Sequence, residues 1–186
     1  MTSISPTIQK IATTFRLTGW ISVWAQGILT LVSGFTLLFA GGASTRTPGT
    51  AAASPGTGIG GFLTLLGIGV LVFNIYWAFS RYVLIGRKLR GDAADRPKKS
   101  DTIQAIRVGL IASLTGMLLA LIGAEAIVGA LAAKAFTQGF GSFVNVDPSK
   151  FIQPLDVLVV QASINVILAQ FLGIAAALWL LNRMSR

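Results

Sequence analysis

The chain contains no cysteine and no histidine, and only six of its 186 residues are acidic. Without those side chains it cannot form a disulfide, bind haem iron through His or Cys, or build a zinc–thiolate or iron–sulfur site from its own residues. The Ser/His and Cys/His pairs of nucleophilic catalysis are also excluded, and the sequence has no phosphate loop of the Walker type. We therefore expect no enzymatic activity and no cofactor.

Charged residues of both signs are scarce, at 11% of the chain, whereas 53% of the residues are apolar. A soluble domain carries about 25% charged residues. A helix needs roughly 18 apolar residues to cross the hydrocarbon core of a bilayer. The sequence therefore predicts an all-α, polytopic membrane protein, with a single membrane domain over residues 1–186. Its bundle of four transmembrane helices is expected at about residues 17–40, 59–79, 108–133 and 155–181.

The basic residues are unevenly distributed between the expected loops. Twelve of the 15 fall before the first span, between the second and third spans, or after the fourth, and eight of these lie in the central loop 80–107. The positive-inside rule then places this loop and both termini in the cytoplasm or its equivalent. The most clustered of these residues are Arg87, Lys88, Arg90, Arg96, Lys98 and Lys99. Because they flank apolar spans, we interpret them as topology anchors that can also bind anionic membrane lipid, and we expect no nucleic acid partner.

Residues outside the spans carry weaker signals. Residues 3–16 place apolar side chains at helical spacing with basic residues between them, which predicts a short N-terminal amphipathic helix on the membrane surface; a loosely ordered tail is the alternative. We expect neither a secretory signal nor a long transit peptide. The segment 41–58 has the composition of a flexible loop. The aromatic residues of the segment 134–154 instead predict a structured loop at the outer surface.

Small residues recur at four-residue spacing along the third span and form one smooth stripe, which Gly109, Ser113 and Gly123 widen. The stripe consists of Ala112, Gly116, Ala120 and Ala124. In lipid, helices associate through close packing, which small side chains allow. The stripe therefore predicts packing against another span of the same chain, or alternatively a contact in a homo-oligomer.

Polar residues inside the spans are a sharper signal, because each costs a few kcal/mol when it faces lipid. Counted from the outer ends at about 1.5 Å per residue, Gln26, Asn74 and Gln170 lie at one level, slightly past the midplane. A second layer nearer the outer face contains Glu125, Gln161, Asn165 and Ser33. The sequence therefore predicts two polar layers inside the bundle.

Glu125 is the only carboxylate that we place within a span, so it is the residue on which a metal site would depend. In the structural interpretation, Gln161 or Asn165 satisfies it and the contact fixes helix register. In the functional interpretation, one carboxylate with amide oxygens offers a proton site or hard ligands for a cation. The identity of any metal is left open by these residues.

Three segments of the chain resemble a known family of four-span membrane proteins of unknown function from cyanobacteria and chloroplasts. The segment 19–40 resembles the family's first span, 116–129 its third, and 155–165 with 178–181 its fourth. Chloroplast relatives are described either as a component of the inner-envelope protein translocon or as an iron permease of that envelope.

The resemblance implies a four-helix bundle in a photosynthetic membrane, either the plasma or the thylakoid membrane of a cyanobacterium. It implies a transport-related protein, such as a metal-ion (iron) permease. The alternative is a non-enzymatic accessory or assembly subunit of a larger membrane complex, such as a protein translocon or a photosynthetic complex. Glu125, Asp147 and Asp156 are the carboxylates that leave an oxygen-ligand site open.

Overall fold

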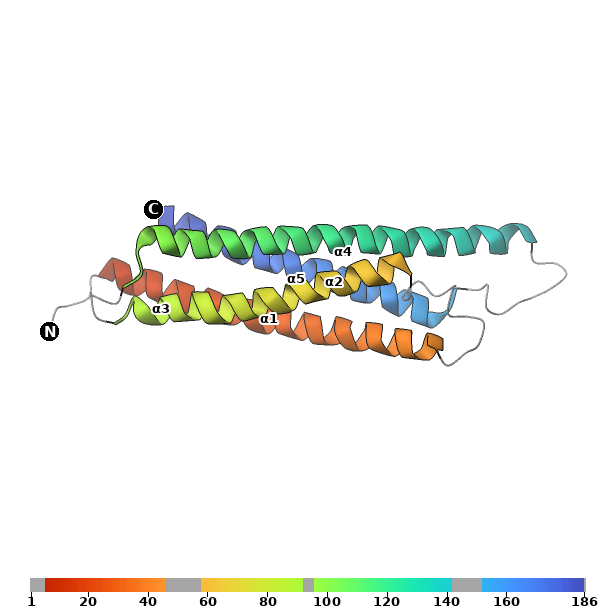
Figure 1. Ribbon diagram of the computed structural model, residues 1–186, viewed down its shortest axis with the longest axis horizontal. Helices are drawn as coiled ribbons and strands as arrows, with labels where there is room; N and C mark the ends of the chain where they lie inside the picture. Colours follow the sequence, from red (N-terminus) through yellow and green to blue (C-terminus); the bar gives the residue numbers. More distant parts are fainter. Residues whose placement is uncertain (1–5, 46–57, 92–95, 142–151, 186) are drawn as a thin grey trace. The chain divides into compact units, whose positions relative to one another are not determined.

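A computed structural model describes residues 6–45, 58–91, 96–141 and 152–185 of the chain (Figure 1). Helix is the only regular secondary structure among these residues. The elements are α1 (Pro6–Thr45), α2 (Ile59–Trp77), the π-helix η1 (Ala78–Val83), α3 (Leu84–Lys88), α4 (Lys99–Gly141) and α5 (Pro154–Ser185). The predicted all-α fold class is confirmed. Helices satisfy every backbone polar group within the segment, which is what a lipid environment demands.

Four helical segments in the described part of the chain are long and apolar enough to cross a membrane. They are Gln9–Ala40, Ile59–Lys88, Lys99–Phe136 and Pro154–Met184. The predicted number of spans is confirmed, and the chain is a membrane protein. Each helix extends beyond its apolar run, because polar and basic residues also continue a helix once the apolar run has formed it. The second span is composite, since α2 continues through η1 into α3 without a loop.

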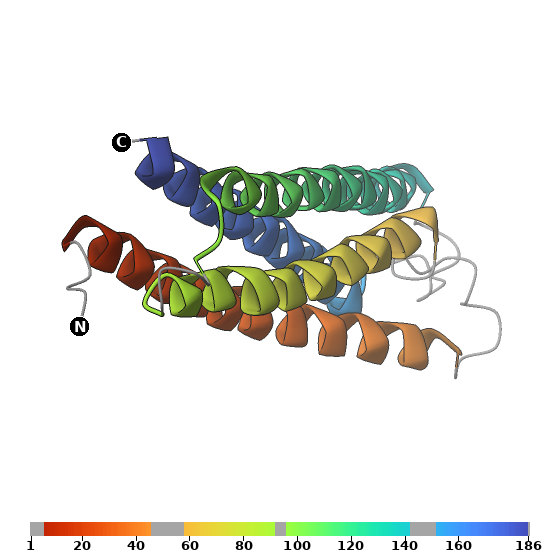
Figure 2. The ribbon, with the colours of Figure 1, turned by 60° about the vertical axis from the view of Figure 1, so that its left-hand side comes forward.

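The N-terminal segment is helical, as expected, but it is not a separate element. Helix α1 runs through residues 6–16 into the first span as one uninterrupted ribbon (Figure 2). Ala12 and Phe15 are fully buried, so the apolar face of this segment packs on protein. Gly86 of α3 permits the close approach of α3 to α1, because a Cβ at that position would lie 3.1 Å from the Ala12 carbonyl oxygen.

The helices of the second, third and fourth spans extend beyond the predicted span bounds into the predicted connecting segments. The second span ends at Lys88 in a turn in which the Gly91 amide donates to the Lys88 carbonyl, and α4 already begins at Lys99. The expected outer loop 134–154 begins instead as the last turns of α4, where Phe136 is exposed. The predictions for the first outer loop beyond Thr45, and for residues 142–151 of the second, lie outside the described residues.

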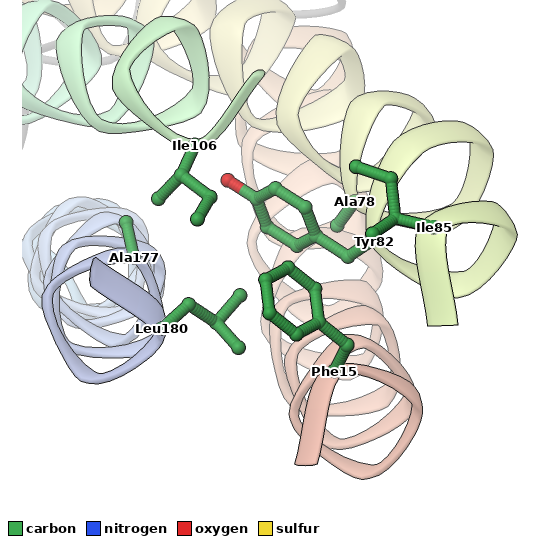
Figure 3. Packing of buried hydrophobic residues seen from close by; sticks show 7 residues of the cluster. All are labelled: Phe15, Ala78, Tyr82, Ile85, Ile106, Ala177 and Leu180. Carbon is green, nitrogen blue, oxygen red and sulfur yellow. The ribbon is translucent and has the colours of Figure 1, made fainter. Parts of the chain in front are cut away.

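The chain divides into two compact units, and each of the four long helices contributes to both. Unit 1 comprises Met1–Ile28, Val70–Gly116 and Ala169–Arg186, and unit 2 comprises Leu29–Gly69 and Met117–Leu168. Figure 3 shows the hydrophobic core of unit 1, in which side chains from several helices meet around the Tyr82 ring. Its residues are Phe15, Ala78, Tyr82, Ile85, Ile106, Ala177 and Leu180. The core of unit 2 is smaller and consists of Leu37, Ala40, Ile127, Val159 and Ala162.

Candidate functional site

A cluster of buried polar side chains lies in unit 1 and joins three helices. The Asn74 side-chain amide on α2 donates to Ser113 Oγ on α4 at 3.0 Å and to Gln170 Oε1 on α5 at 3.1 Å. All three side chains are at most 5% exposed. The hydrogen bonds replace the water that these groups lose in the bilayer, so the cluster fixes the register of three spans.

Helix α1 adds Gln26 to the same neighbourhood. Gln26 Nε2 donates to Ser22 Oγ one turn earlier at 2.9 Å. A Cβ at Gly173 would lie 2.6 Å from Ser113 Oγ and 2.8 Å from Gln26 Nε2, so the two polar groups flank that glycine. The structure thus brings together the three residues of the predicted mid-membrane layer, Gln26, Asn74 and Gln170.

Two members of the cluster were missed as polar-site residues. From the sequence, Ser113 is interpreted as a helix-packing residue and Ser22 is not singled out, although Ser22 precedes Gln26 by one helical turn. The spacing of four residues between them was the available signal, because side chains at i and i+4 lie on one helix face. Chemically, the cluster offers neutral hydroxyl and amide groups without a carboxylate.

The small-residue stripe of α4 packs within the chain. Ala120 is fully buried, and Ala112 and Ala124 are partly buried. A Cβ at Gly116 would overlap the Gln170 side-chain amide and would lie 2.8 Å from Val70 Cγ1. Helices α2 and α5 therefore lie directly against the stripe at Gly116, as the intramolecular interpretation requires.

The predicted outer polar layer does not form a site. Ser33 is fully buried, and its hydroxyl has no hydrogen-bond partner among the described residues. Gln161 is exposed and donates from Nε2 to Oδ1 of Asn165 on its own helix at 3.1 Å. Glu125 is also exposed, and no described residue forms a hydrogen bond or ion pair with it.

The expectation that Glu125 lies inside the bundle, satisfied by Gln161 or Asn165, is therefore wrong, and the reason is helical phase. Gly123 and Ile127, two residues before and after it, face α2: a Cβ at Gly60 would lie 2.8 Å from the Gly123 carbonyl oxygen and 2.7 Å from Ile127 Cγ1. Each residue turns a helix by about 100°. Glu125 consequently points away from the packed face of unit 2.

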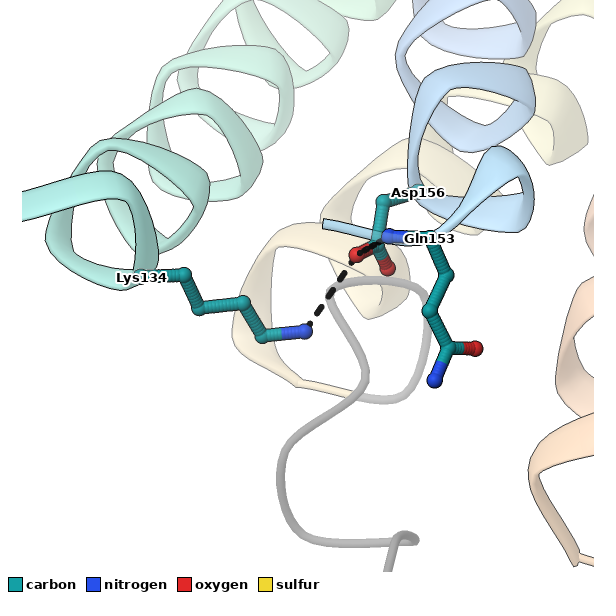
Figure 4. A network of polar contacts seen from close by, with 3 residues as sticks. All are labelled: Lys134, Gln153 and Asp156. Carbon is teal, nitrogen blue, oxygen red and sulfur yellow. Dashed lines mark hydrogen bonds and ion pairs between the residues drawn. The ribbon is translucent and has the colours of Figure 1, made fainter. Parts of the chain in front are cut away.

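Asp156 is engaged at the start of α5 and is not a free ligand. Its Oδ2 accepts from the backbone N–H of Gln153 at 3.0 Å and lies 3.3 Å from Lys134 Nζ of α4 (Figure 4). The first contact is half of a capping box, and Pro154 occupies the first helical position, where its missing N–H costs nothing. Asp147 lies outside the described residues. Within the described part of the chain, no three Asp, Glu, His or Cys residues gather as a metal site.

The basic residues of the predicted central loop lie in unit 1, on η1, on α3, on α4 and in the segment between α3 and α4. Arg87, Lys88, Lys98 and Lys99 are exposed. Arg90 Nη2 donates to Thr13 Oγ1 at 2.8 Å, and Arg96 Nη2 donates to the Gly91 carbonyl oxygen at 3.5 Å. Of these six residues, Arg90 is the one that forms a hydrogen bond to another span among the described residues. The four exposed residues Arg87, Lys88, Lys98 and Lys99 are accessible on the surface of unit 1, and their role as topology anchors stays a prediction.

Nearly the whole chain is similar to known proteins. A family model described as "Protein of unknown function (DUF3611)" matches residues 5–185. The chain is similar to Protein TIC 21, chloroplastic, of Arabidopsis thaliana, with 31% identity over 187 residues. The match covers 98% of this chain and 60% of that relative, so the chain spans about three fifths of the relative's length. No solved structure matches the chain.

Proposed function

The chain belongs to the DUF3611 family of proteins of unknown function, and on that premise we propose that it is a non-enzymatic subunit of a larger membrane assembly, of the translocon type. In this proposal the protein acts by holding other membrane-embedded chains through its outer helix faces. Both termini and the segment 89–98 lie on the cytoplasmic side of a photosynthetic membrane, as the distribution of basic residues favours.

The observation that carries the proposal is the outward position of Glu125 and Gln161 within the spans. A carboxylate near the centre of a spanning helix costs about 2.5–3.5 kcal/mol on insertion scales, and a polar side chain in lipid seeks a hydrogen-bond partner. The packed interior of unit 2 does not provide one for Glu125. A partner at this surface would remove the cost, whereas a solitary protein would bear it permanently.

The similarity to a chloroplast protein also supports the proposed role as a subunit of a membrane assembly. That relative is Protein TIC 21, chloroplastic, and nearly the whole of this chain aligns with it. Chloroplast members of the family that the sequence resembles are described in one account as a component of the inner-envelope protein translocon. The buried cluster of Asn74, Ser113 and Gln170 fits this role as well, because it stiffens the chain without any reactive group.

Purification from native membranes in a mild detergent tests the proposal. A tagged chain should migrate as an assembly larger than its own monomer. The Glu125→Leu variant should dissociate from this assembly, because leucine is stable in lipid and has no carboxylate that needs a hydrogen-bond partner. Leu38→Ala is the matched control, since Leu38 is 71% exposed on α1 and carries no polar group. A wild-type chain that runs only as a monomer would overturn the proposal.

A second candidate function is transport of a metal cation such as iron. The observation that favours it is that two side-chain oxygens, Ser113 Oγ and Gln170 Oε1, converge on the Asn74 amide within the spans, since hard cations prefer oxygen ligands. Cells carrying Asn74→Leu or Glu125→Gln should then accumulate less iron at equal protein level. Unchanged accumulation in both variants would exclude this function.

A further inference from the structure

Glu125 and Gln161 lie at the same depth, as the contacts around Thr64 in unit 2 indicate. A Cβ at Gly123 of α4 would lie 2.7 Å from Thr64 Oγ1. Ser163 Oγ of α5 lies 3.4 Å from the same oxygen. Gly123 and Ser163 therefore flank one side chain of α2 and mark one level in the membrane.

Helices α4 and α5 run antiparallel from that level. Lys134, further along α4, pairs with Asp156 at the start of α5. A step of two residues forward from Gly123 along α4 and a step of two residues back from Ser163 along α5 thus point in the same direction. Each step covers about 3 Å. These displacements lead to Glu125 and Gln161, which consequently share a level.

Gln161 faces outward for the same reason as Glu125. Val159 and Ser163, two residues on either side of it, are buried, so the intervening side chain points about 200° away from them. Ile127 of α4 and Ala162 of α5 belong to the same buried cluster of unit 2. Two neighbouring helices of unit 2 thus present an acidic group and an amide to the outside at equal depth.

We propose that a second copy of this chain covers this surface, with the Glu125 carboxyl group of one copy hydrogen-bonded to the Gln161 amide of the other. The inference rests on the proposed function and names its partner. Copies inserted in the same orientation are related by an axis along the membrane normal, which preserves depth. Groups that meet across such an interface must share a level, and these two do.

The two side chains are chemically complementary in either protonation state of the acid. A carboxylate accepts a hydrogen bond from the Gln161 amide N–H, and a protonated carboxyl group donates to its carbonyl oxygen. Gly129, one turn from Glu125, has open space around its Cβ position, so a neighbouring helix can approach there without a clash. The single chain therefore supplies both halves of one interface.

Disulfide cross-linking tests the pairing directly, because the chain has no cysteine of its own. Two differently tagged copies, one carrying Glu125→Cys and the other Gln161→Cys, are expressed together and oxidised in the membrane. We expect a covalent dimer containing both tags, since a disulfide joins Cα atoms only about 4.4–6.8 Å apart. Cross-linking of Glu125→Cys to itself, without cross-linking to Gln161→Cys, would overturn the pairing.

Leu168→Cys is the matched control for Gln161→Cys. Leu168 is exposed on the same outward side of α5, but it lies seven residues away, which is roughly 10 Å along the helix axis. Paired with Glu125→Cys, it should give at least tenfold less covalent dimer than Gln161→Cys. Equal yields from the two positions would mean random collision of copies and would overturn the inference.

A non-covalent readout separates this inference from the proposed function. In mild detergent, Glu125→Gln should retain self-association, because the amide still forms hydrogen bonds, whereas Glu125→Leu should weaken it at least tenfold. If the wild-type chain migrates in a larger assembly but tagged copies neither cross-link nor co-purify, the second-copy inference is overturned and the proposed function stands. If the wild-type chain is monomeric, both are overturned.

Discussion

Replacing Gly123 by alanine tests the backbone contact between α2 and α4 in unit 2. The new Cβ would lie 2.9 Å from the Gly60 carbonyl oxygen and 3.0 Å from the Thr64 backbone nitrogen, whereas ordinary contacts begin at 3.4 Å. Neither atom can rotate away, because both belong to the α2 backbone, so the helix itself must shift. Overpacking of this kind costs about 1–3 kcal/mol. Alanine recovers about 1 kcal/mol through its higher helix propensity.

The difference between these two effects leads us to expect that Gly123→Ala lowers the free energy of unfolding by up to about 2 kcal/mol. Equilibrium unfolding in mixed micelles with increasing denaturing detergent, followed by tryptophan fluorescence, measures it. Gly69→Ala is the control, because Gly69 lies on α2 with nothing within 4 Å of its Cβ position. This variant should be as stable as the wild type or slightly more stable. Equal stability of the two variants would refute the close approach of the helices.

Three further predictions concern the polar groups. Asn74→Leu removes two buried hydrogen bonds, to Ser113 and Gln170, and should lower stability by about 1–3 kcal/mol in the same titration; an unchanged midpoint would mean that the bonds are not formed. Asp156→Ala removes the ion pair and the capping hydrogen bond at the start of α5, and should lower the free energy of unfolding by about 1–3 kcal/mol. A melting curve identical to that of the wild type would contradict this prediction. A cysteine at Lys98 should react with a membrane-impermeant maleimide from the cytoplasmic side alone, and labelling from the opposite side would reverse the proposed orientation.

The number and type of elements could be predicted because lipid allows few alternatives. A long apolar run without charges has no soluble interpretation, and its backbone must be helical. The ends of the helices could not be predicted equally well. Lys99 and Lys134 lie on α4 although they are polar, because a helix continues through any helix-compatible residue until a turn or a cap ends it.

The mid-membrane polar cluster was accessible from the sequence because depth follows directly from residue count along a straight helix. Gln26, Asn74 and Gln170 were placed at one level by that count, and the structure brings all three to one neighbourhood. The same count placed Glu125 and Gln161 at similar depths. It could not say which side of the helix each occupies, because rotation about the helix axis depends on which residues the neighbouring helix contacts.

The sequence by itself determined the class of this protein, its four spans, the expected side of its basic segment and the depth of each polar residue. Hydropathy, charge and the rise per residue are local properties, and they need no knowledge of neighbours. Only the tertiary structure decided the direction in which each side chain points. The contacts of Gly123 and Ile127 with α2 turn Glu125 outward, and that rotation changes it from an internal ligand into the surface group on which the proposed interface depends.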